Sequence, residues 1–251
     1  MDGPEVFVRH LAEHQYHPRS DAHSNAICNA ILTDLLAHCQ PFADKARRGE
    51  VVATLNHTVK VNYQDWNIDL AIGPPPGSPE PPTTGPIRFG VPATIEIGLE
   101  AKAVMTEHGK ARRNRLRDLQ AFHQYAHAYN PKTIAVGTVA INVSAIFWSP
   151  LRPAGDITYH DNIATLGPKT VEVFRGLPLR HTPEEGPGLE AACVVVIKHD
   201  NLAKNPTPPL GAPTAHAATL VLQAPAPQVG DPLHYATMIQ RICTAYRARW
   251  S

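Results

Sequence analysis

A nearly continuous apolar run at residues 133–143, TIAVGTVAINV, sets the fold class of this chain. Such a run is typical of a strand that is buried on both faces of a sheet. Residues 110–129 precede it with apolar side chains at helical spacing, and the Asn130-Pro131 pair ends that segment. A helix that leads directly into a doubly buried strand favours an α/β protein.

The segments before residue 110 extend this pattern. A helical periodicity at residues 24–39 is followed by three runs with strand character at residues 51–61, 66–72 and 94–102. The first two runs are expected to form a hairpin. The order predicts an α-β-β-β-α-β core over residues 24–145 with a mixed central sheet. Further strands are expected at residues 171–174 and 192–198, and a helix is expected at residues 231–250.

Proline is unusually frequent, with 25 residues among 251. Eight prolines lie in residues 73–92 and seven in residues 205–232, which predicts two extended loops because proline fixes φ and lacks the N–H that a strand donates. We therefore expect a domain over residues 1–204 that carries the insertion 73–92. A linker at residues 205–230 and a C-terminal helix at residues 231–251 should follow.

Composition excludes several classes of protein. Lys and Arg number 23 against 22 Asp and Glu, so a DNA partner would have to meet a local basic patch. No apolar stretch approaches the roughly 20 residues that cross a bilayer, and residues 1–10 lack the apolar region of a secretory signal. The cysteines at positions 28, 39, 193 and 243 form no CxxC pair, which predicts reduced thiols and a cytoplasmic location.

Three residues form the candidate site. Asp69 lies in the second strand, and Glu100 and Lys102 lie two positions apart in the third, so they share a face about 7 Å apart. Two carboxylates suit a hard divalent cation such as Mg²⁺, with the Ala101 carbonyl as a further ligand. The cation would polarise a phosphoryl group, and the lysine would position water or stabilise charge. This set predicts phosphodiester hydrolysis.

The arrangement resembles the PD-(D/E)XK nuclease superfamily over residues 24–143, with Asp on the second strand and Glu-x-Lys on the third. The resemblance implies an Mg²⁺-dependent endodeoxyribonuclease, in which Mn²⁺ can substitute. Its catalytic residues would be Asp69, Glu100 and Lys102, and its metal ligands Asp69, Glu100 and Ala101. The chain departs from the family pattern where Ile68 replaces the proline before Asp69, and where the insertion lengthens the Asp69–Glu100 spacing.

A basic segment follows the candidate site. Its cations are expected to contact DNA phosphates, and the alternative is a solvated helix face. They are Lys110, Arg112, Arg113, Arg115 and Arg117. Glu107 and His108 precede this helix as possible accessory contacts to metal or phosphate, and the alternative is a plain capping turn. The first helix of related nucleases often adds an acid, for which Asp21, Asn25 and Asp34 are the candidates.

The favoured function is a DNA endonuclease of a prokaryotic restriction or antiviral defence system. A homodimer is expected from the resemblance alone. One alternative is a repair or recombination nuclease that acts on branched or single-stranded DNA. The other is a DNA-binding module on a nuclease fold that has lost activity, against which the complete Asp…Glu-x-Lys set argues. Because the sequence has no GxGxxG or Walker loop, no nucleotide cofactor is expected.

Overall fold

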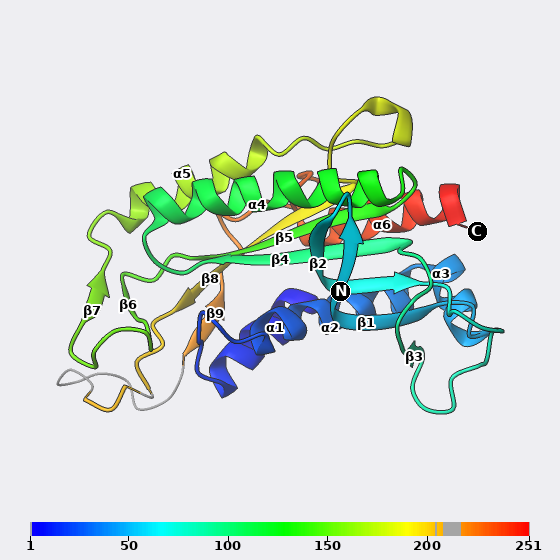
Figure 1. Ribbon diagram of the computed structural model, residues 1–251. Coiled ribbons are helices and arrows are strands. Elements are labelled where there is room, and N and C mark those ends of the chain that lie inside the picture. The colour runs from blue at the N-terminus through cyan, green and yellow to red at the C-terminus, as the bar shows by residue number, and fades with distance from the viewer. Residues whose placement is uncertain (1, 204, 208–216, 251) are drawn as a thin grey trace.

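The structure, a computed structural model, describes residues 2–203, 205–207 and 217–250. It is an α/β fold built on a mixed seven-stranded sheet with the order β3-β1-β2-β4-β5-β8-β9 (Figure 1). The strands are β1 (Val52–Val61), β2 (Gln64–Gly73), β3 (Arg88–Phe89), β4 (Ile97–Val104), β5 (Ile134–Asn142), β8 (Ala191–His199) and β9 (Ala218–Leu220). A separate hairpin pairs β6 (Ile146–Trp148) with β7 (Ile157–Tyr159).

The helices cover both faces of the sheet, as Figure 1 shows. They are α1 (Gly3–Glu13), α2 (Ala22–His38), α3 (Gln40–Arg47), α4 (His108–Tyr129), α5 (Ile163–Arg175) and α6 (Tyr235–Trp250). Side chains of α1, α2, α3 and α6 share one buried cluster, and we call this side of the sheet the α2 face. Side chains of α4 and α5 share the other cluster, on the α4 face. None of the helices in these described ranges is long and apolar enough to cross a bilayer.

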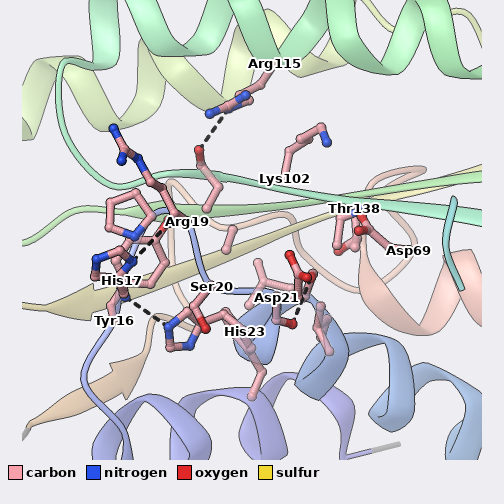
Figure 2. A pocket seen from close by; sticks show the side chains of 18 residues that line it. Tyr16, His17, Arg19, Ser20, Asp21, His23, Asp69, Lys102, Arg115 and Thr138 are labelled. Carbon is pink, nitrogen blue, oxygen red and sulfur yellow. Dashed lines mark hydrogen bonds between the residues drawn. The ribbon is translucent and has the colours of Figure 1, made fainter. Parts of the chain in front are cut away.

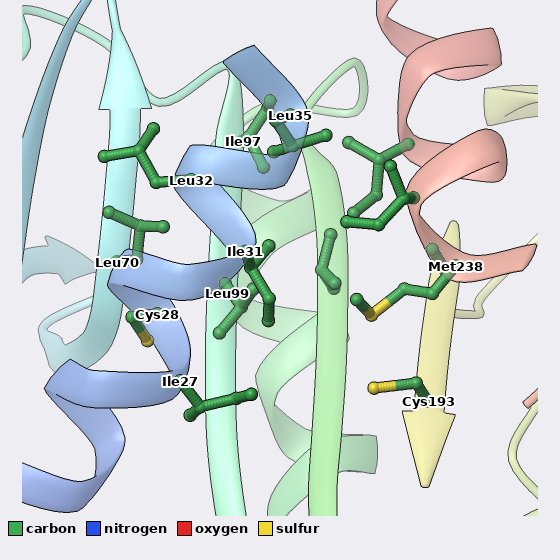
Figure 3. Packing of buried hydrophobic residues seen from close by; sticks show 14 of the residues in the cluster. Ile27, Cys28, Ile31, Leu32, Leu35, Leu70, Ile97, Leu99, Cys193 and Met238 are labelled. Atoms are coloured by element: carbon green, nitrogen blue, oxygen red, sulfur yellow. The ribbon is translucent and has the colours of Figure 1, made fainter. Parts of the chain in front are cut away.

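The central strands confirm the predicted order. β1, β2 and β4 form an antiparallel meander, and α4 then leads into β5, which pairs parallel to β4. All nine residues of β5 are buried, as the apolar run predicted. On the α2 face, Ile31 and Leu35 of α2 pack over Ile97 and Leu99 of β4 (Figure 3). Burying such a side chain stabilises the fold by about 1.5–3 kcal/mol.

Two predictions about local structure were wrong. Residues 171–174 lie in α5, with Val171 and Phe174 buried on one side of that helix, and not in a strand. A run of four residues is too short to distinguish the helical period of about 3.6 residues from the strand period of two. The prediction of four reduced thiols also fails, because Cys39 and Cys243 form a disulfide with a Cα–Cα distance of 5.4 Å. Their separation of 204 positions gave no sign of this bond.

Both proline-rich stretches contribute to the sheet. In the insertion between β2 and β4, Ile87 is 4% exposed and β3 adds parallel to β1 at the sheet edge. After the second stretch, Met238 and Ile242 of α6 are fully buried against the same cluster as α2. Residues 208–216 of the expected linker lie outside the described residues. The C-terminal helix therefore packs within the main core.

Candidate active site

The candidate site lies where β2 and β4 stop pairing. Their ladder ends at the pair Leu70 and Leu99, and the next residues in that register are Asp69 and Glu100. There the Asp69 Oδ2 atom accepts a hydrogen bond from the backbone N–H of Ala101 at 2.7 Å. The carboxylate thus takes the place of a strand partner, and the gap between the strands holds an acidic side chain.

The regular alternation of side chains along β2 is broken at Asp69. Residues two apart on a regular strand face the same side, but Ile68 packs on the α4 face and Leu70 on the α2 face. Across the hairpin, Asn56 has a φ of 53°, and the pairing of β1 with β2 is interrupted at this residue although the register continues on both sides. A left-handed residue in a strand is the kind of irregularity that re-aims side chains. It explains why Asp69 reaches the gap between the strands.

Glu100 and Lys102 lie on the α4 face of β4. Gly98, two residues earlier on the same side, faces Trp66 and Phe122. The Lys102 ammonium forms an ion pair with Glu100, and the two side chains are 23% and 12% exposed. Figure 2 shows Lys102 on the side of the strands toward α4. The predicted shared face of these two residues is therefore present.

The three charges act on one another. Burial raises the pKa of Glu100 to about 7, an effect that Lys102 opposes and the nearby Asp69 charge strengthens. Burial also raises the pKa of Asp69, against the Ala101 N–H and Lys102, which lower it. Cys28 of α2 has a pKa raised by burial and then by both carboxyls. The structure therefore brings Asp69, Glu100 and Lys102 together, with more negative charge than one lysine neutralises.

A polar cavity of about 280 Å³ adjoins this site (Figure 2). Asp69, Ala101 and Lys102 line one side of it. The connection between α1 and α2 lines the other side with Tyr16 and Arg19. The site therefore faces a small cavity that is partly open to solvent.

The first core helix contributes one candidate acid. Asp21 lines the cavity, and its charge raises the pKa of Asp69. Asn25 instead accepts a hydrogen bond from Asn56. Asp34 is buried, where it accepts hydrogen bonds from the Gly3 N–H and the Tyr235 hydroxyl. The choice that the sequence left open thus falls on Asp21.

The predicted DNA-binding cations divide into two groups. Lys110, Arg113 and Arg117 are exposed. Arg115 lines the cavity and donates to the Ala103 carbonyl and to Asp118. Among the described residues, the Nε and Nη1 atoms of Arg112 are buried without a hydrogen-bond partner. The exposed group can reach a ligand on the surface, and the Arg115 side chain, which is 42% exposed, can reach one in the cavity.

The accessory candidates do not line the cavity. Glu107 is exposed and pairs with Arg152 at 3.4 Å. His108 is 2% exposed, and its Nε2 atom bonds to the Asn142 carbonyl oxygen at 2.7 Å. Both residues therefore have local structural partners.

Sequence analysis missed the wall formed by the connection between α1 and α2. Tyr16, His17 and Arg19 line the cavity from this segment, and His23, at the start of α2, stacks on Tyr16 with ring centroids 4.8 Å apart. No motif marks them, because their place depends on how α1 packs against α2. The density of histidines at residues 10–23 was the only local signal.

No protein-family model, curated protein or solved structure significantly matches the chain. The relation to PD-(D/E)XK nucleases that the residue pattern and the order of elements predicted therefore stays a prediction. Among the described residues, no cluster of three or more His, Cys, Asp or Glu side chains could hold a metal ion. The candidate ligands remain the Asp69 and Glu100 carboxylates and the Ala101 carbonyl, with Asp21 as a further acid at the cavity.

Proposed function

We propose that this chain is a metal-dependent deoxyribonuclease with a restriction-endonuclease-like core, and that it hydrolyses phosphodiester bonds at Asp69, Glu100 and Lys102. The observation that carries the proposal is the meeting of these three residues at the gap between β2 and β4, beside a polar cavity. An ion pair that served stability alone would not need Asp69 in contact with the neighbouring backbone.

The donor atoms suit Mg²⁺, with Mn²⁺ as a substitute. Asp69 and Glu100 offer hard carboxylate oxygens, and the carbonyl of Ala101 would add a third ligand. The raised pKa of Glu100 supports this choice, since burial and the Asp69 charge disfavour two carboxylates with only Lys102 nearby. A divalent cation would restore the balance and keep both groups ionised.

The chain's own residues would then hold and orient the reactants. Bound Mg²⁺ supplies positive charge for a phosphoryl oxygen and lowers the pKa of water. Lys102, released from Glu100, would orient that water and stabilise the charge that develops on phosphate. One water is consumed: its oxygen bonds to phosphorus, the P–O bond to the leaving nucleoside breaks, and the leaving oxygen takes up a proton.

The wider biological setting follows from the resemblance. Exposed Lys110, Arg113 and Arg117 would hold the DNA backbone near the site. We propose a role as a cytoplasmic endonuclease of a restriction or antiviral defence system, with a homodimer as the form that cuts both strands. A nuclease of repair or recombination is the second candidate, favoured by the small size of the cavity.

The test is cleavage of plasmid and circular single-stranded DNA with Mg²⁺, Mn²⁺ or EDTA. Lys102→Ala should lower the cleavage rate by about 10²–10⁴-fold, the usual contribution of proton-transfer groups, while DNA binding in Ca²⁺ persists. Lys60→Ala is the matched control, because this lysine is 74% exposed and pairs with Asp65 at the hairpin. Wild-type cleavage by Lys102→Ala, or no cleavage by the wild type with either metal, would refute the proposal.

A further inference from the structure

The cavity beside Asp69 is bounded by groups of different chemistry. Tyr16 and His17 contribute rings on the side of the connection between α1 and α2. Ile27 of α2 and Val195 of β8 add apolar surface. Asp69 and Lys102 border the same space, so a molecule in the cavity would lie against the candidate catalytic residues.

Two guanidinium groups also border this cavity. Arg19 is exposed, and its backbone N–H donates to the Nδ1 atom of His17 at 3.2 Å. Among the described residues, no acid lies within ion-pair distance of its guanidinium. Arg115 approaches from α4, and Figure 2 shows both arginines on the side of the cavity toward that helix. A phosphate between them would gain charge-assisted hydrogen bonds, which are the stronger kind.

The size of the space limits what can enter it. The volume of about 280 Å³ lies just below the range of small-molecule sites, which is roughly 300–1,000 Å³. A duplex is too wide for a space of this size, and a paired base would reach into it only by leaving the stack. One unpaired nucleotide combines an aromatic base with a phosphate. These are the groups that rings and arginines recognise.

We propose that this cavity holds one unstacked nucleotide of single-stranded DNA, with its base against Tyr16 and His17 and its phosphate between Arg19 and Arg115. The adjacent phosphodiester bond then lies beside Asp69 and Lys102. The inference rests on the proposed nuclease function and specifies its substrate: single-stranded DNA or unpaired segments, in preference to duplex. Cleavage of circular single strands is compatible with it, since no strand end is needed.

The first experiment measures binding without turnover. A single-stranded oligonucleotide with one 2-aminopurine is titrated with the protein in Ca²⁺, and unstacking in the cavity should raise its fluorescence. Ser24→Phe, on the partly exposed part of α2 that lines the cavity, should fill the space and weaken binding at least tenfold. Asn29→Phe is the matched control, because Asn29 is exposed on the same helix and lies outside the cavity. It should bind as the wild type does.

Arginine variants test the phosphate contact. Arg19→Gln should weaken binding of the oligonucleotide by about tenfold, the effect of removing one charge-assisted hydrogen bond. Arg9→Gln serves as the control, since Arg9 is exposed on α1 outside the cavity lining. Inorganic phosphate should compete weakly with the oligonucleotide for wild type and fail to compete for Arg19→Gln. Equal decreases in affinity for the two variants would contradict a phosphate contact at Arg19.

The outcomes separate this inference from the proposed function. If duplex of the same sequence binds as tightly, or Ser24→Phe binds normally, the single-strand inference is overturned while plasmid cleavage still supports a nuclease. If the oligonucleotide binds in the cavity as expected but neither Mg²⁺ nor Mn²⁺ gives cleavage, the binding inference stands and the nuclease proposal falls. Faster cleavage of circular single strands than of plasmid supports both.

Discussion

Glu190, the residue before β8, is a buried carboxylate held by several donors. Its side chain is 1% exposed and lies 2.6 Å from Arg180 and 2.8 Å from Arg249. It also accepts the backbone N–H of Ala135 at 2.7 Å. Burial alone would raise the pKa of this carboxyl, but hydrogen bonds from His127 and Arg249 hold it below the ordinary value. This cluster ties α6 and the segment after α5 to the sheet.

We expect Glu190→Gln to lower the free energy of unfolding by about 3–5 kcal/mol, because it leaves two buried guanidinium groups without a counter-charge. Urea denaturation monitored by circular dichroism measures this loss. The control is Glu172→Gln, whose carboxylate is 74% exposed and pairs with Arg175. It should change stability by less than about 1 kcal/mol. Similar values for the two variants would show that the buried cluster contributes little.

His23 makes the wall of the cavity sensitive to acid. Its Nε2 atom accepts the backbone N–H of His17 at 3.0 Å, so the ring proton lies on Nδ1, which donates to the Nε2 atom of His10. Burial, and after it the charges of His10, His199, His14 and His17, lower the pKa of His23 to about 4. A second proton, on Nε2, would remove the acceptor of this hydrogen bond and place two N–H donors against each other.

Stability should therefore fall as the pH drops from 6.5 to about 4. Over this interval His23 is protonated in the unfolded state but stays neutral in the folded state. The free energy of unfolding therefore decreases by at most about 3 kcal/mol. Urea denaturation at several pH values measures the slope. His23→Gln should flatten it, whereas exposed His181→Gln should leave it unchanged. An unaltered slope in His23→Gln would mean that other groups govern the acid response.

At the scale of elements, α4 turns its cations in two directions. Arg113 and Arg117 are exposed and lie four residues apart, on one side of the helix. Arg115 instead donates to the Ala103 carbonyl at 3.4 Å and to Asp118 at 2.9 Å. The sequence could place all of these arginines on a helix. It could not separate the exposed ones from the inward ones, because that division depends on where β4 meets α4.

Replacing both Arg113 and Arg117 with alanine should weaken DNA binding for every sequence. The slope of log affinity against log salt should flatten by up to about two, one for each phosphate that the variant no longer neutralises. Affinity is measured in Ca²⁺ at several salt concentrations. A double change of Arg47 and Arg48, exposed near the end of α3 and paired with Asp44 and Glu50, is the control. If both double variants behave alike, the DNA does not follow α4.

For the other elements too, features with a local sequence signal could be predicted, and features that depend on long-range packing could not. The meander and the doubly buried β5 could be predicted, because a period of two and an apolar run are local signals. The helix α5 could not, since only Val171 to Phe174 stood out from its sequence. Likewise, Asp69 and Glu100 were predicted to lie close together. The break in side-chain alternation of β2 opposite Asn56 could not be predicted, because it depends on backbone geometry that no sequence pattern encodes.

At the scale of the whole molecule, the disulfide between Cys39 and Cys243 joins distant parts of the chain. Cys39 lies between α2 and α3, and Cys243 lies in α6, so the bond fixes the C-terminal helix to the first helices. Cys28 and Cys193 are buried free thiols. A reducing cytoplasm keeps most thiol pairs reduced, so an oxidised Cys39–Cys243 pair in the cell would count against the proposed cytoplasmic location. The redox state of Cys39 and Cys243 therefore bears on where the protein works.

We expect the oxidised protein to lose about 2–5 kcal/mol of unfolding free energy on reduction, since a bond across 204 positions restricts the unfolded chain strongly. Urea denaturation with and without dithiothreitol measures the loss. A variant with both Cys39 and Cys243 changed to alanine should have the lower stability and no response to dithiothreitol. Thiol titration of the wild-type protein, unfolded without a reductant, should detect only Cys28 and Cys193. Four reactive thiols would mean that the bond does not form, and that the packing of Met238, Ile242 and Tyr246 and the Arg249–Glu190 ion pair hold α6 in place without it.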